Sequence, residues 1–298
     1  MKKIYSLCVL ILSGTYINAQ SPTITSCNLP IIGDTIYFLR VDTTGLTEGN
    51  KGANITWNFS SLTLNGQKDT TIYYTPSATP FPTSFPSSNY SATDNGSAFQ
   101  DYGYYDNQTT GTTLLGGDSP QGTTNYSDTW QLYWFPLNYL DSLGDSFKAV
   151  FNGTSGATIR RQGTSKTVAD GYGTLILPTA TYPNVLRIKL QETETDSVFF
   201  GASFIGSSII TLTQFYWINP TYRNGLYYYQ TIVNIGGVNN DPKHAAYWQN
   251  LKPCLATGTY EITNNKTVNV YPNPFSSQTT LQTDKVFKNA TLTVYNSF

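Results

Sequence analysis

The chain has 298 residues, of which 12% are charged and 14% are aromatic, with 23 Tyr and 24 Gly. Its 17 basic and 18 acidic residues give a net charge of −1 and form no basic block, so nucleic acid and anionic membrane surfaces are poor candidate partners. This composition favours an extracellular all-β protein.

The first 20 residues have the pattern of a secretory signal peptide. Lys2 and Lys3 form a basic start, residues 4–12 form an apolar stretch, and Ala19 offers a small residue for cleavage. Thr15 stands where a lipoprotein signal would need cysteine. No later segment has the roughly 20 apolar residues of a membrane helix. We therefore predict export, with a secreted or outer-membrane surface-attached product and no transmembrane segment.

Two cysteines, Cys27 and Cys254, remain once Cys8 leaves with the signal peptide. Neither belongs to a CxxC motif or a Cys/His cluster, so no metal site is expected. In an oxidising compartment we predict one disulfide that joins the two ends of the main domain. The alternative is a pair of buried free thiols.

Strand patterns recur along the chain, and no helical period is sustained. Strands are predicted at residues 35–41, 54–59, 70–75, 99–106, 129–135, 186–190, 209–217 and 226–235. Four prolines between residues 76 and 86 predict an irregular loop. Asn224-Gly225 predicts a hairpin turn, and helix is expected only in a short turn around residues 243–249. Residues 21–258 are thus predicted to form an all-β domain of sandwich or jelly-roll type.

Aromatic side chains gather on several of these strands, and neighbouring residues of a strand point to opposite faces. One member of each aromatic pair must leave the core unless both faces are covered. Exposed rings could stack on sugars or dock a partner, while burial between sheets is the alternative. The candidate ligand-binding residues are Tyr104, Trp134, Trp217 and Tyr228.

Motifs of catalysis are scarce. His244 is the only histidine, and no GxSxG, HExxH or P-loop motif accompanies it. We therefore assign no catalytic residue and no cofactor.

Glu192, Glu194 and Asp196 are the best carboxylate group, because alternate positions of one strand lie on one face, about 7 Å apart. They would suit an acid/base pair or calcium. The favoured interpretation is a solvated strand end, because Leu186 and Ile188 share the same parity.

Residues 57–62, 135–147, 168–178 and 185–189 are similar to segments of uncharacterised secreted Bacteroidota proteins, a resemblance that implies no activity. Within them, Asp170, Gly171 and Gly173 predict a tight turn between strands.

The chain's last 31 residues open with a short proline-containing motif. It consists of Val270, Tyr271, Pro272, Asn273, Pro274 and Phe275. This motif resembles the start of the type A C-terminal sorting domain that the type IX secretion system of Bacteroidota reads. The resemblance implies a linker at residues 259–267, the first strands of an Ig-like sandwich at residues 268–298, and the type IX machinery as partner. That family's domain runs on for several strands, so the sequence is expected to be truncated at Phe298.

Together these patterns predict a secreted or surface-displayed protein with a non-catalytic role in adhesion or in binding glycan or protein. The first alternative is a secreted hydrolase of polysaccharides, which convergent acids in one deep cleft would favour. The second is a structural surface or matrix component, which the lack of a concave site would favour.

Overall fold

The computed structural model describes residues 21–94, 101–235, 240–254, 268–271 and 280–283. The chain divides after Cys254 into two units, and each is treated by itself. The strands of the first unit are β1 (Thr35–Val41), β2 (Gly52–Asn58), β3 (Leu64–Tyr74), β4 (Tyr90–Asp94), β5 (Tyr102–Gln108), β6 (Gly111–Ser119), β7 (Gly122–Trp134), β8 (Ser142–Gly153), β9 (Ala157–Ile176), β10 (Thr181–Phe200), β11 (Ser203–Ile218), β12 (Tyr222–Arg223), β13 (Tyr227–Ile235), β14 (Asn240–Gln249) and β15 (Lys252–Pro253). Two 3₁₀ turns, Ser26–Asn28 and Pro76–Ala78, complete the regular structure described.

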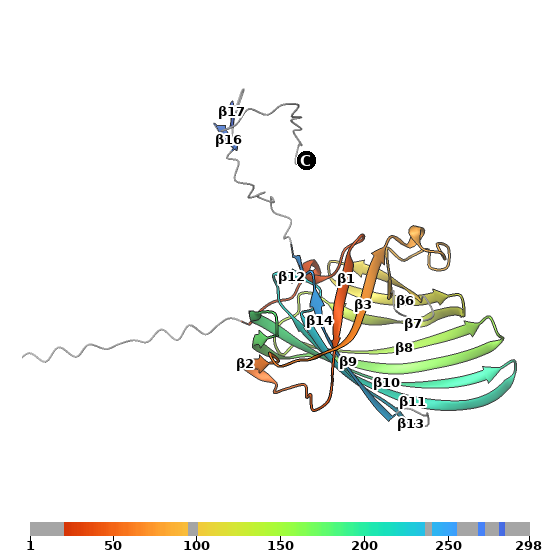
Figure 1. Ribbon diagram of the computed structural model, residues 1–298. Coiled ribbons are helices and arrows are strands. Elements are labelled where there is room, and N and C mark those ends of the chain that lie inside the picture. The colour runs from red at the N-terminus through yellow and green to blue at the C-terminus, as the bar shows by residue number, and fades with distance from the viewer. Residues whose placement is uncertain (1–20, 95–100, 236–239, 255–267, 272–279, 284–298) are drawn as a thin grey trace, which may run out of the picture. The chain divides into compact units, whose positions relative to one another are not determined.

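Twelve of these strands form one closed antiparallel barrel (Figure 1). The order runs β10-β11-β13-β14-β1-β3-β4-β5-β6-β7-β8-β9, and β9 pairs back onto β10 to close the ring. The prediction of an all-β domain is confirmed, but the barrel corrects the expected sandwich or jelly-roll. Closure pairs the backbone groups of every wall strand, which leaves no open sheet edge in the ring.

The four consecutive strands β8 to β11, of 12, 20, 20 and 16 residues, include the three longest strands of the wall. They run in antiparallel register from end to end and curve together in Figure 1. A register shift between Arg187 and Ile188 marks a bulge in the β9–β10 pair, which bends the strands locally.

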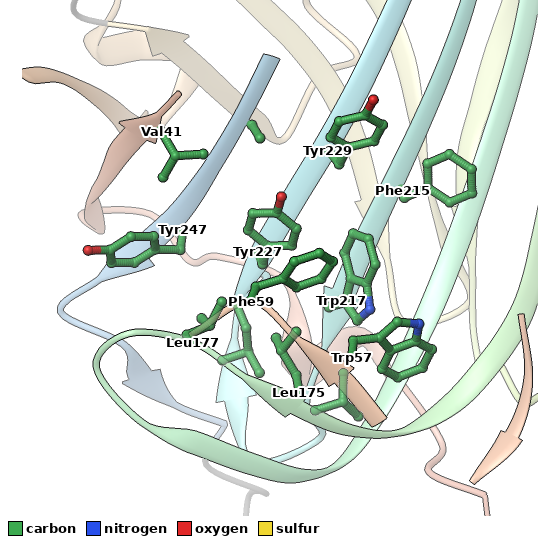
Figure 2. Close-up of a cluster of buried hydrophobic side chains, with 13 residues drawn as sticks. Val41, Trp57, Phe59, Leu175, Leu177, Phe215, Trp217, Tyr227, Tyr229 and Tyr247 are labelled. Carbon is green, nitrogen blue, oxygen red and sulfur yellow. The ribbon is translucent and has the colours of Figure 1, made fainter. Parts of the chain in front are cut away.

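A hydrophobic cluster on the outside of the barrel covers one wall (Figure 2). Residues 42–62, here called the strap, bring Trp57 and Phe59 onto outward side chains of β11 and β13. Trp217 and Tyr227 are fully buried there, and the Trp57 and Phe59 rings lie 6.0 and 5.6 Å from the Trp217 ring. The strap gives these outward strand positions an apolar cover.

Within the strap, β2 pairs in parallel with the end of β9. Gly171 and Gly173 allow this approach, because a Cβ on Gly173 would lie 1.9 Å from the Ile55 carbonyl oxygen. The predicted turn at Asp170–Gly173 is therefore wrong. The glycines lie inside a continuous strand and serve close backbone contact.

The barrel end that carries the N-terminal segment is sealed by a second cluster, here called the floor. Ile24 and Leu137 exchange backbone hydrogen bonds of 2.9 and 2.8 Å, and both side chains are 1% exposed. They pack with Ala169, Leu186 and Ile188. Leu186 and Ile188 confirm the core face predicted for their strand.

Cys27 and Cys254 form the predicted disulfide, with their Cα atoms 5.4 Å apart. Beside it, the Asn28 amide donates to the carbonyl oxygens of Pro220 and Tyr222. The disulfide thus ties the two ends of the barrel domain together.

The helical turn predicted at residues 243–249 is also wrong, because these residues lie in strand β14. Ala245 and Tyr247 pack in the outer cluster, while Trp248 faces the barrel interior, so both faces of this strand are covered. The apolar residues of β14 therefore do not alternate with polar ones, and the sequence lacks the period-2 pattern of a half-buried strand there. The predicted hairpin of β11 and β13 is confirmed, but their connection contains β12, and Asn224, with φ of 68°, lies in a bend of this longer loop.

The second unit contains the pair β16 (Val268–Tyr271) and β17 (Thr280–Thr283), in which Tyr271 lies opposite Thr280. Val270 and Tyr271 of the proline-containing motif belong to β16. Pro272, Asn273, Pro274 and Phe275, and the signal peptide, lie outside the described residues. No helix in the described ranges is long and apolar enough to cross a membrane.

Candidate ligand cavity inside the barrel

A cavity of about 750 Å³ lies within the barrel above the floor. Its wall takes side chains from β1, β3 to β7, β10, β11, β13 and β14, and Ile24 and Leu137 line its closed end. The wall positions alternate with the outward ones, so Tyr216 and Tyr228 face the cavity while Trp217 and Tyr227 face the strap. The volume is in the range of small-molecule sites.

Two groups of aromatic rings line this cavity. Phe38, Tyr228 and Trp248 form the first, with centroids 5.6 to 6.3 Å apart. Tyr90 lies between Tyr73 and Tyr105 in the second, at 5.4 and 6.2 Å. Burial raises the pKa of the Tyr73, Tyr90, Tyr105 and Tyr228 hydroxyls, so these phenols are neutral and can donate hydrogen bonds.

Arg40 of β1 and Asp69 of β3 form an ion pair in the cavity wall. Arg40 donates to Asp69, and its other nitrogen lies 3.5 Å from Nδ1 of His244. Burial and the neighbouring guanidinium lower the pKa of His244, which keeps its imidazole neutral. Arg40 and Asp69 therefore neutralise each other beside a neutral ring.

Two polar atoms of the wall have no hydrogen-bond partner within the protein. They are Oδ1 of Asn107 and Oγ1 of Thr112, and both are buried. Asn107 and Thr112 lie opposite each other in the β5–β6 pair, and both line the cavity. Burying an unpaired polar atom costs about 1–3 kcal/mol, so this adjacent pair calls for a functional explanation.

The three acids singled out in the sequence lie on the inner face of β10, where they are buried rather than solvated. Glu192, Glu194 and Asp196 are 7%, 6% and 7% exposed. Arg161 of β9 binds both oxygens of Asp196, at 2.8 and 2.7 Å. Its Nε also lies 3.1 Å from Glu194, without hydrogen-bond geometry. The prediction of a solvated strand end is wrong, because β10 continues as part of the barrel wall through these residues.

Burial raises the pKa of Glu192 to about 8, with further contributions from the charge of Glu194 and a hydrogen bond to it. The Arg161 guanidinium pairs with Asp196 and Glu194, while Glu192 keeps its proton at neutral pH. The described residues include no group of three His, Cys, Asp or Glu arranged to hold a metal ion.

The four candidate ligand-binding aromatics lie in different surroundings. Tyr228 lines the cavity. Trp134 packs against the floor, and Trp217 is 0% exposed in the outer cluster. Tyr104 is 1% exposed and stacks on Phe85, with centroids 4.7 Å apart. Sequence reasoning missed Phe38, Trp248, Asn107 and Thr112 as wall residues, because the register that brings the first two beside Tyr228 is not visible in the sequence.

No protein-family model, curated protein or solved structure matches this chain. What the cavity does is therefore argued from its wall, which offers aromatic faces, neutral hydrogen-bonding groups, one cation paired with Asp69, and two further acids, Asp94 and Asp101.

Proposed function

We propose that this is a non-catalytic binding protein, secreted or displayed on the cell surface, that takes a small ligand into its barrel. The cavity of about 750 Å³ is the observation that carries this function. A concave wall of aromatic rings with a few polar groups is the usual composition of a small-molecule site.

The cavity also bears on the two alternatives. A concave site of this size weakens the case for a purely structural component. The hydrolase needs two carboxyl groups about 5–10 Å apart on either side of a substrate bond. Neither Glu192 nor Glu194 lines the cavity. Of the aspartates that do, Asp69 pairs with Arg40, and Asp94 accepts a hydrogen bond from Thr71. The binding role is therefore preferred, inside the barrel rather than on the flat aromatic surface first considered.

Binding in the cavity predicts that Trp248 reports on the ligand. In the chain that starts at residue 21, a bound compound should change tryptophan fluorescence, and Trp248→Ala should weaken its binding at least about tenfold, equivalent to about 1.4 kcal/mol. Titration calorimetry on the variant would measure this loss.

Tyr37→Ala is the matched control, because Tyr37 neighbours Phe38 on β1 and points to the other face. It should leave binding unchanged. Equal loss in both variants, or turnover of a polysaccharide that Glu192→Gln abolishes, would contradict a binding role for the cavity.

For delivery, we infer export by the type IX secretion system, which the proline-containing motif and the signal-peptide pattern support. Removing all residues after Thr267 should hold the protein in the periplasm of a host with that system, because the region that the machinery reads is gone. Immunoblots of periplasm and medium measure the distribution. A variant that lacks only residues 259–262 of the linker is the control, and undiminished release of the truncated chain would refute this route.

A further inference from the structure

The cavity wall also points to a class of ligand: we propose that it binds a neutral sugar, with hydroxyl groups of the ring held by Asn107 and Thr112. This inference rests on the proposed binding function and specifies it.

The unpaired atoms are the first argument. Thr112 is 5% exposed, and its hydroxyl has no partner in the protein, while Oδ1 of Asn107 lies buried in the neighbouring strand. Residues directly opposite in an antiparallel pair have Cβ atoms about 5 Å apart. An amide oxygen accepts, and a hydroxyl both donates and accepts. Each of the two atoms has less than 1 Å² of exposed surface in the ligand-free structure, so the two side chains must turn toward the cavity to meet a ligand. The pair then matches a ligand that presents hydroxyl groups on adjacent ring carbons.

The surrounding rings are the second argument. Tyr105 precedes Asn107 by two residues on the same strand face, and Tyr133 lies opposite Thr112 in the β6–β7 pair. Both line the cavity. An aromatic face carries negative potential and attracts polarised C–H groups, which a sugar ring presents beside its hydroxyls. The polar pair therefore lies beside the aromatic faces, so that one sugar ring could stack on the rings and hydrogen-bond to the pair.

The charges are the third argument. Among the described residues that line the cavity, Arg40 is the one with a basic side chain, and Asp69 already pairs with it. The two other acids of the lining, Asp94 and Asp101, are exposed, and Asp94 accepts a hydrogen bond from Thr71. An anionic ligand would find no spare cation. A purely apolar ligand such as an acyl chain would leave Asn107 and Thr112 without partners in a dry site, at a cost for each polar group.

The experiment uses the chain from residue 21 on and titrates it calorimetrically with neutral mono- and disaccharides of glucose, galactose, mannose and N-acetylglucosamine. Glucuronate, glucosamine and palmitate serve as anionic, cationic and apolar probes. We expect at least one neutral sugar to bind at least tenfold more tightly than its charged analogues. Thr112→Val should weaken that binding about tenfold, while Thr112→Ser, which keeps the hydroxyl, should retain it.

A second readout needs no ligand. Thr112→Val removes an unpaired buried hydroxyl, so it should leave the melting temperature of the unliganded protein unchanged or higher. Tyr227→Phe is the matched control, because the Tyr227 hydroxyl is also buried and unpaired but lies in the outer cluster. It should show the same stability effect and normal sugar binding.

Three results would overturn the sugar assignment. Palmitate binding that depends on Trp248, with no sugar bound, would refute it while the binding function stands. Sugar binding unaffected by Thr112→Val would refute the placement on Asn107 and Thr112. Absence of binding by all probes would refute both the ligand class and the cavity's function.

Discussion

Replacing Asp170 by Asn is expected to lower the free energy of unfolding by about 3–5 kcal/mol, because it leaves a buried guanidinium without its carboxylate. Arg187 binds both oxygens of Asp170, at 2.7 and 3.0 Å. The Arg187 side chain is 2% exposed and that of Asp170 is 11% exposed, so water replaces little of the lost interaction.

Arg187 also holds the strap. Its Nη1 donates to the carbonyl oxygens of Glu48 and Gly49, at 2.8 and 3.0 Å. The guanidinium carbon lies 5.6 and 5.7 Å from the ring centroids of Trp57 and Trp217. Because these contacts join β10 to the strap, loss of the ion pair should loosen the outer cluster as well.

Equilibrium unfolding in urea measures this loss, and the double variant Asp170→Leu with Arg187→Met is its control. The apolar pair leaves no unpaired charge, so it should recover a substantial part of the stability. An exposed ion pair contributes less than about 1 kcal/mol to the free energy of unfolding. If Asp170→Asn lowers that free energy by no more than this, the Asp170–Arg187 pair does not have the stabilising role that its burial indicates.

The strands could be predicted because the alternation of apolar and polar residues is visible within each short segment of the sequence. Residues 35–41 were predicted as a strand and form β1, and Leu186 and Ile188 were assigned to the right face. Barrel closure left no such signal. It depends on the pairing of β1 with β14, for example Phe38 with Trp248, which joins the two ends of the domain's sequence, and the same alternation also suits a sandwich.

The site was less predictable, because the strap covers the outside of the wall that carries Tyr228. Trp217 and Tyr228 both lie on strands whose successive residues alternate between two faces. Trp217 faces the strap and Tyr228 faces the cavity. Parity separates the two faces without saying which is the interior. Thr112 and Asn107 carry no sequence signal, since a missing hydrogen-bond partner is a property of packing alone.

The inner carboxylates predict that stability falls as the pH rises. In the folded protein Glu192 has a pKa of about 8, against about 4.3 for an unfolded glutamate. Between these values the folded state holds a proton that the unfolded state has lost. The free energy of unfolding should therefore decrease with pH across this window, by up to about 1.4 kcal/mol per unit.

Glu192→Gln should remove this slope. An amide stays neutral at every pH in the window and can donate to Glu194 as the protonated acid does, so stability near pH 5 should change little and stability at pH 9 should rise. Urea unfolding at pH 5, 7 and 9 gives the comparison, and Glu48→Gln is the control because that side chain is exposed on the strap. A wild-type protein equally stable at pH 5 and 9 would show that Glu192 is ionised in the barrel wall. Arg161 would then have to neutralise Glu192 as well as Glu194 and Asp196, which one guanidinium already committed to Asp196 through two hydrogen bonds is poorly placed to do.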